Sequence, residues 1–144
     1  MSGAVAFGPG IRQTLLKCTV EYDKEGEPGA RSSMEFILIH VIAAIELHPG
    51  TRDRFLREFA RLEPEVHAEV GCIEYGAAVD LVSGVPGQVP VRPDVVTVVE
   101  KWSSIETLGA HGAAPHMQAY RERVRDFVIR VTLQVLAPVN AVPA

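Results

Sequence analysis

Four segments of the chain have the apolar patterns of strands. Residues 36–47 are almost wholly apolar and rich in isoleucine, which is typical of a strand buried on both faces. Residues 71–82 and 95–102 predict a second and a third strand. Residues 130–137 predict a fourth, because they alternate three apolar residues with polar ones: Val131, Leu133 and Val135.

Helical periodicity lies between these strands. Residues 51–62 place Phe55, Leu56, Phe59 and Leu62 on one stripe, which predicts an amphipathic helix. We expect Pro64 to end this helix or to begin a short further turn that runs to Glu69.

A second helical region follows the third strand. Ser103-x-x-Glu106 has the pattern of a capping box and predicts a short helix ending near His111. Gly112 interrupts it, and Pro115 suits the first turn of a new helix. This helix carries its own apolar stripe: Met117, Tyr120, Val124 and Phe127.

The resulting order, β-α-β-β-α-β, predicts an α+β fold of the ferredoxin-like type. Such a sheet has helices on one face only, yet the first three strands carry apolar side chains on both sides. A second copy of the sheet is the obvious cover. The pattern therefore predicts a homodimer that closes a shared α+β barrel.

Composition limits the organisation and the partners of the chain. Its 144 residues suit one domain, which we place at residues 34–140, after a flexible extension of residues 1–33 and before a tail of residues 141–144. Whether translation starts at Met34 is left open. The net charge of −4, with no basic cluster, disfavours nucleic acids and anionic membranes as partners.

The chain also lacks signals that would direct it out of the cytoplasm. No apolar run is long enough for a membrane helix, and the N-terminus has no basic region followed by a sustained apolar one. Cys18 and Cys72 are far apart and in no CxxC pattern, so we interpret them as free thiols. We therefore expect a cytoplasmic protein.

Candidate chemistry gathers after the third strand. The single tryptophan, Trp102, ends that strand, and two of the five histidines, His111 and His116, follow it. A large flat side chain beside groups that exchange protons near neutral pH suggests a pocket for an aromatic molecule with a proton to move.

Four motifs in register resemble the antibiotic biosynthesis monooxygenase family. They are the apolar strand with its Pro49-Gly50 turn, Glu69-x-Gly71-Cys72-x-x-Tyr75, Glu100-x-Trp102, and His111 followed by Pro115-His116. The resemblance covers residues 36–137. It implies a dimeric α+β barrel and cofactor-independent oxygenation of a small hydroxylated aromatic, a quinol or an anthrone-like polyketide. Molecular oxygen would be the co-substrate, with no metal or flavin.

The resemblance and the residue types together suggest roles in such a site. We expect His40 or His111 to be the catalytic base, Trp102 to stack on the substrate, and Tyr75 and His116 to orient it. The site would face a cavity completed by the second chain, and the proline-rich loop at residues 83–94 would shape its mouth.

Each of these residues also has a structural interpretation. Trp102 and Tyr75 could pack in the core, His40 could be a satisfied strand residue, and His111 could favour a helix dipole. Glu100 in an apolar strand needs a partner, and we expect an arginine. The last two histidines, His48 and His67, have the setting of surface residues.

Three alternative functions remain open. The first is a non-catalytic barrel that binds a small ligand or a partner protein. The second is haem binding or degradation; the haem-degrading relatives have an asparagine on the first strand, and residues 36–47 contain none. The third is a histidine–carboxylate metal site, although His111 and His116 lack the i,i+4 spacing of helix-borne zinc ligands.

Overall fold

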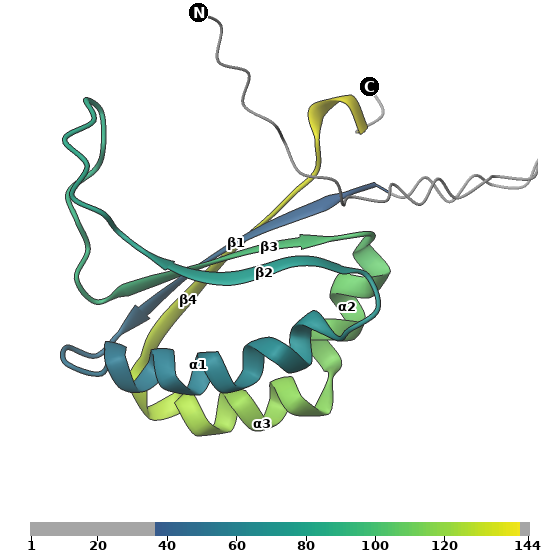
Figure 1. The fold of residues 1–144 in the computed structure, drawn as a ribbon, viewed down its shortest axis with the longest axis horizontal. Helices are drawn as coiled ribbons and strands as arrows, with labels where there is room; N and C mark the ends of the chain where they lie inside the picture. The colour runs from purple at the N-terminus through teal and green to yellow at the C-terminus, as the bar shows by residue number, and fades with distance from the viewer. Residues whose placement is uncertain (1–36, 142–144) are drawn as a thin grey trace, which may run out of the picture. The chain divides into compact units, whose positions relative to one another are not determined.

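The computed structural model describes residues 37–141. The predicted extension at residues 1–33 and most of the predicted tail lie outside this range. The described part has the following elements in chain order (Figure 1): β1 (Ile39–Leu47), α1 (Arg52–His67), β2 (Cys72–Val79), β3 (Val95–Trp102), α2 (Ile105–Ala113), α3 (Pro115–Val124), the 3-10 turn η1 (Arg125–Phe127), β4 (Val128–Leu136) and the 3-10 turn η2 (Val139–Ala141).

The sheet confirms the ferredoxin-like α+β arrangement. Its strand order is β2-β3-β1-β4, and each neighbouring pair is antiparallel. The helices lie together on one side of the sheet, with α1 and α3 side by side (Figure 1). The two central strands, β1 and β3, therefore supply the floor of the core.

Strand β1 is buried on its helix-facing side in the single chain, and burial of its other face by a second sheet stays a prediction. Its residues alternate between buried and half-buried from Ile39 to Leu47. The buried set faces the helices and continues across the register, where Val41 lies opposite Glu100 and Ala43 opposite Val98. The other set is only half-buried, because the helices cover one face of the sheet.

Helix α1 continues through Pro64 to His67, so of the two expectations the end of the helix at this proline is wrong, and the further turn after it is part of the same helix. Its buried stripe extends past the proline as far as Val66. Proline removes one backbone donor from a helix interior. Burial of this stripe against the sheet outweighs that loss, since amphipathic packing supplies most helix stability in proteins.

The predicted capping box is present but begins one residue later. Ser104 caps α2, and its backbone and hydroxyl exchange hydrogen bonds of 3.3 Å with Thr107. The backbone N–H of Ser103 instead donates to the carbonyl of Gly71 at 2.9 Å. Helix α3 begins at Pro115, as predicted.

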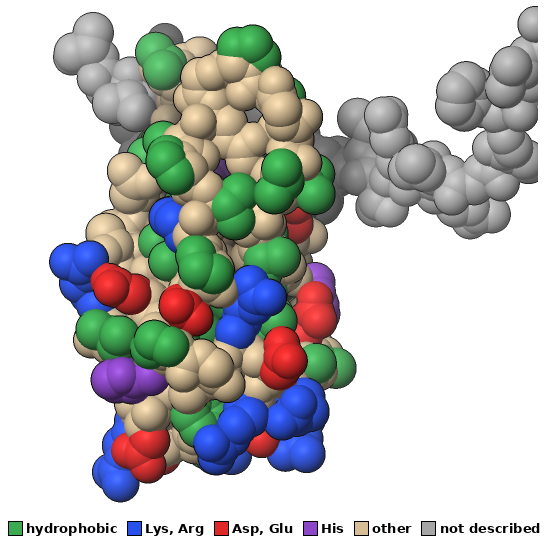
Figure 2. Space-filling view, turned by 90° about the vertical axis from the view of Figure 1, so that its left-hand side faces the viewer, with side chains coloured by type: hydrophobic (Ala, Val, Ile, Leu, Met, Phe, Trp, Pro, Cys, Tyr) green, Lys and Arg blue, Asp and Glu red, His purple; other side chains and the backbone are tan. Residues whose placement is uncertain are grey.

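The surface carries charges of both signs and a group of exposed apolar side chains. On the side shown in Figure 2, basic and acidic side chains are interspersed over the helices, and apolar side chains gather on the part formed by loop 80–94. No helix within residues 37–141 has the length and hydropathy needed to span a membrane.

Candidate active site

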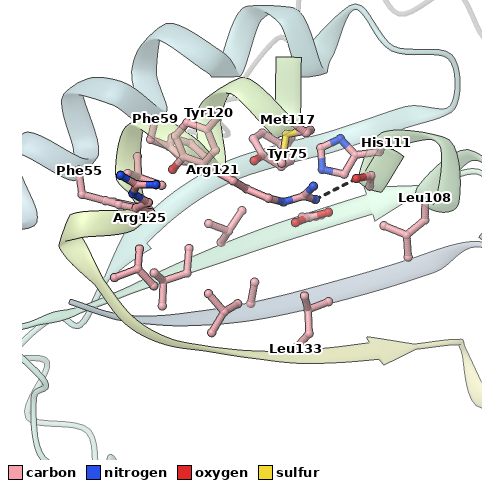
Figure 3. Close-up of a pocket in the computed structure, with 18 residues that line it drawn as sticks. Phe55, Phe59, Tyr75, Leu108, His111, Met117, Tyr120, Arg121, Arg125 and Leu133 are labelled. Carbon is pink, nitrogen blue, oxygen red and sulfur yellow. Dashed lines mark hydrogen bonds between the residues drawn. The ribbon is translucent and has the colours of Figure 1, made fainter. Parts of the chain in front are cut away.

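An apolar cavity of about 430 Å³ lies between the sheet and the helices (Figure 3). Val131 and Leu133 of β4 line it while remaining 50% and 57% exposed, which indicates that it opens along this strand. The described lining residues all belong to one chain, and the contribution of a second chain to the cavity stays a prediction. The polar or ionisable side chains that line it are these: Tyr75, Glu100, His111, Tyr120, Arg121 and Arg125.

His111 lies in the last turn of α2 and joins the cavity wall to Glu69. Its ring is buried, and Nδ1 lies 3.0 Å from Oε1 and 3.1 Å from Oε2 of Glu69. An ionised carboxylate only accepts hydrogen bonds, so we assign the proton to Nδ1. Nε2 then carries a lone pair and has no hydrogen-bond partner within residues 37–141. A carboxylate that orients an imidazole in this way is the arrangement of a general base.

Glu69 owes its position to a tight connection between α1 and β2. Its N–H donates to the carbonyl of Val66 at 3.0 Å, and Gly71 follows with φ +84°. A Cβ atom at Gly71 would lie 2.5 Å from Cγ2 of Thr107, so glycine allows this connection to approach the start of α2. Glu69 is part of a sequence motif, but local sequence gave it no predicted role, because its partner His111 lies 42 residues away.

His116, in the first turn of α3, contacts the same carboxylate through Nε2. Side-chain exposure increases from 6% for His111 to 12% for Glu69 and 23% for His116. His116 does not line the cavity. The ligand atoms of the three residues lie within 4.8 Å of one another, so the group could also hold a metal ion. The hydrogen bonds to Glu69 account for the arrangement without one.

Trp102 is a core residue behind this wall. It is 0% exposed, does not line the cavity, and packs its ring 4.7 Å from that of His111. The predicted stacking on a substrate is not possible from this position, since no face of the indole is accessible.

Glu100 lines the cavity beside Trp102. Trp102 Nε1 donates to its Oε2 at 2.8 Å, so tryptophan takes the place of the predicted arginine partner. Burial raises the pKa of Glu100, and Glu69 adds to the rise, while the hydrogen bond from Trp102 and the nearby His111 oppose it.

Two tyrosines complete the wall. Tyr75 stacks on Phe59 with ring centroids 5.2 Å apart and meets His111 edge-on at 5.6 Å. The hydroxyl of Tyr120 is buried and has no hydrogen-bond partner among the described residues. Burial raises the pKa of both phenols. The sequence predicted Tyr120 only as part of an apolar stripe, so its polar contribution was missed.

The remaining predicted residues lie elsewhere. His40 is on the helix-free face of β1, opposite Lys101 and Leu136, so the sheet separates it from His111. The alternation that exposes Ala43 to the helices turns His40 away, and it cannot be the base of this cavity. No residue of loop 83–94 lines the cavity; Val91 and its neighbours line a separate cleft on the sheet.

These features define a ferredoxin-like α+β domain with an apolar small-molecule cavity and, in its wall, a histidine that is hydrogen-bonded to a carboxylate behind it. The chain belongs to the antibiotic biosynthesis monooxygenase family, whose sequence pattern matches residues 38–123. This confirms the resemblance of its motifs.

A curated relative supports this assignment, and solved structures share the fold. The chain is 39% identical over 103 residues to the probable quinol monooxygenase YgiN of Escherichia coli, a match that covers 70% of this chain and 98% of the relative. It shares its fold with a putative antibiotic biosynthesis monooxygenase from Caulobacter crescentus (TM-score 0.61, 21% identity, 72% of this chain and 91% of that one). Rv0793 from Mycobacterium tuberculosis is similar as well (TM-score 0.59, 24% identity, 71% and 95% covered).

Proposed function

We propose that the protein is a cofactor-independent monooxygenase that acts on a small hydroxylated aromatic, a quinol or an anthrone-like polyketide. The observation that carries this proposal is His111, which lies in the wall of an apolar cavity and is hydrogen-bonded through Nδ1 to Glu69 outside that wall. The family assignment and the relationship to a probable quinol monooxygenase support it.

The cavity suits the first step of such a reaction. Apolar side chains from the sheet and the helices would hold a flat ring, and Nε2 of His111 would accept a proton from its hydroxyl or activated C–H group. Glu69 would stabilise the imidazolium that forms. Tyr75, which lines the same cavity, would orient the ring.

The substrate anion would then react with molecular oxygen directly. For an anthrone-like methylene, one oxygen atom becomes a carbonyl and the other leaves as water with the two hydrogens, so no external reductant is needed. The protein's contribution is to bind the ring, remove the proton and keep the anion in an apolar site.

We further propose that the protein is a homodimer that pairs the helix-free faces of two sheets. Ile42 and Val99 lie opposite each other on this face, and both are half-buried in the single chain. The apolar face of a sheet that no helix covers must be buried against another surface, and a second copy of the chain offers the same apolar face.

The test is oxygen consumption with a panel of hydroquinones and anthrones. We expect His111→Gln to lower kcat by about 10²–10⁴-fold, the usual contribution of a general base. His40→Gln tests the other histidine that the sequence offered, and it should stay within about twofold of wild type, since His40 lies across the sheet. Exposed His48 provides the matched control, His48→Gln.

Three outcomes would contradict the proposal or direct it elsewhere. If wild type and His111→Gln consume oxygen at the same background rate with every compound, the cavity is a binding site without this activity. A larger loss in His40→Gln would move the base to the other face. A Soret shift on titration with micromolar hemin would favour haem binding.

A further inference from the structure

Two arginines line the cavity, Arg121 of α3 and Arg125 at the start of η1, and they differ in their partners. Arg125 lies 3.3 Å from a carboxylate oxygen of Glu122 and 3.4 Å from one of Asp126. Arg121 forms no ion pair with any residue of the range 37–141. Of the two arginines, Arg121 is therefore the one without an ion-pair partner among the described residues.

A hydrogen bond ties the exposed side chain of Arg121 to the cavity wall. Nη2 of Arg121 donates to the carbonyl oxygen of Gly112 at 3.0 Å, and Gly112 also lines the cavity. Figure 3 shows the side chain reaching from α3 across the cavity towards His111. This bond uses one of the five N–H groups of the guanidinium, so the others remain for a ligand.

The rest of the cavity offers little to balance the cation. The side chains that line the cavity are predominantly apolar, and the carboxyl group among them is that of Glu100. Burial raises the pKa of Glu100, which favours the neutral form of that group. A permanently charged guanidinium beside an apolar surface attracts an anion, and its planar fork matches a carboxylate.

We propose that this cavity selects planar hydroxylated aromatics that carry a carboxylate, with Arg121 binding the carboxylate while the apolar walls hold the ring. The inference rests on the proposed use of the cavity for a hydroxylated aromatic and narrows that class to aromatic hydroxy acids. Arg121 is a specificity-determining residue in this scheme, and His111 remains the base.

Equilibrium binding tests the inference without any need for turnover. The probes are 1-hydroxy-2-naphthoic acid and its methyl ester, which share a ring and differ in charge, titrated by calorimetry. Wild type should bind the acid about tenfold more tightly than the ester, which corresponds to about 1.4 kcal/mol. Arg121→Gln should lose this preference, because its affinity for the acid should fall while its affinity for the ester stays unchanged.

Arg123→Gln is the matched control, because it removes the same charge from the same helix. Arg123 pairs with Glu58 at 3.0 Å and does not line the cavity. This variant should keep the preference for the acid. Arg121→Lys, which keeps the charge and loses the planar fork, should fall between wild type and Arg121→Gln.

Several results would overturn the inference. Equal affinity of wild type for acid and ester, or binding of neither, would do so without any variant. An equal loss for both probes in Arg121→Gln would indicate apolar packing, and an equal loss of preference in Arg123→Gln would indicate a general field of the helix. Selective acid binding without oxygen consumption would contradict the proposed monooxygenase activity and leave this inference standing.

Discussion

Both carboxylate oxygens of Glu69 lie within hydrogen-bonding distance of Nδ1 of His111, at 3.0 and 3.1 Å. Glu69 follows α1, whereas His111 lies in the last turn of α2, so the fold brings the two residues into contact. The contact fixes which ring nitrogen carries the proton and leaves the other nitrogen available at the cavity wall.

Glu69→Gln therefore tests whether this orientation matters for catalysis. Glutamine keeps the shape, but it removes the charge that would stabilise the imidazolium and allows the wrong tautomer. We expect kcat for oxygen consumption to fall about a hundredfold or more, as for the orienting carboxylate of a catalytic triad, with KM changed by less than about threefold.

Exposed Glu65 on α1 provides the control. Glu65→Gln removes the same charge outside the cavity and should leave kcat unchanged. If Glu69→Gln retains the wild-type kcat, the hydrogen bond only stabilises the fold. A rise in KM at constant kcat would give Glu69 a role in binding instead.

Local pattern predicted most of the fold but not this contact. Strand β3 was predicted with its observed bounds, because its valine-rich run lies between a proline-rich loop and a serine helix cap. At Pro64 the local rule failed, since packing of Val66 in the core outweighs the cost of the proline. Two adjacent serines, Ser103 and Ser104, made the helix start ambiguous by one residue.

The site was harder to predict than the fold, for a physical reason. Alternation indicated that His40 and Ala43 lie on opposite faces of β1, but it could not show which face holds the cavity. The joining of Glu69, His111 and His116 depends on how three connections meet in space. Nothing in the local spacing of these residues contains that information.

Tyr120 provides a test that separates stability from binding. Its buried hydroxyl has no hydrogen-bond partner among the described residues. In the unfolded chain this hydroxyl bonds to water, so folding breaks a hydrogen bond without replacing it. Tyr120→Phe should raise the free energy of unfolding by about 1 kcal/mol, measured by urea denaturation of the ligand-free protein.

The same change should weaken an aromatic ligand if a ligand oxygen satisfies this hydroxyl. We expect the Kd for 1-hydroxy-2-naphthoic acid to rise about threefold to tenfold, the worth of one hydrogen bond. Tyr75→Phe, which removes the other tyrosine hydroxyl of the same cavity wall, serves as the comparison for Tyr120→Phe. A loss of stability in Tyr120→Phe would show that its hydroxyl is bonded in solution.

The buried Glu100 predicts a pH dependence of stability. Its ordinary pKa is 4.5, and burial raises the pKa in the folded chain. Between these two values the folded state retains a proton that the unfolded state has lost, so the free energy of unfolding falls as pH rises through this interval. Above the folded pKa the loss is complete and constant.

Glu100→Gln should remove this dependence. Glutamine cannot ionise, and its oxygen can still accept the hydrogen bond from Trp102 Nε1. We expect the Tm of the variant, relative to wild type, to increase between about pH 4 and pH 8. Glu65→Gln controls for the loss of one charge, and a Tm difference for Glu100→Gln that falls with pH would contradict the assignment.

The proposed dimer is tested on the face of the sheet that the helices leave uncovered. Val99 is half-buried there, opposite Ile42. A charge placed at the centre of an apolar interface is strongly unfavourable. Val99→Lys should therefore halve the mass that light scattering measures, while Glu65→Lys on exposed α1 should leave it at the dimer value. A wild-type monomer, or a Val99→Lys dimer, would contradict the proposal.

The Val99→Lys monomer also tests whether the second chain is needed for the site. Because the described lining residues belong to one chain, this monomer should still bind 1-hydroxy-2-naphthoic acid. Loss of binding in a folded monomer would show instead that the second chain is needed to complete the site.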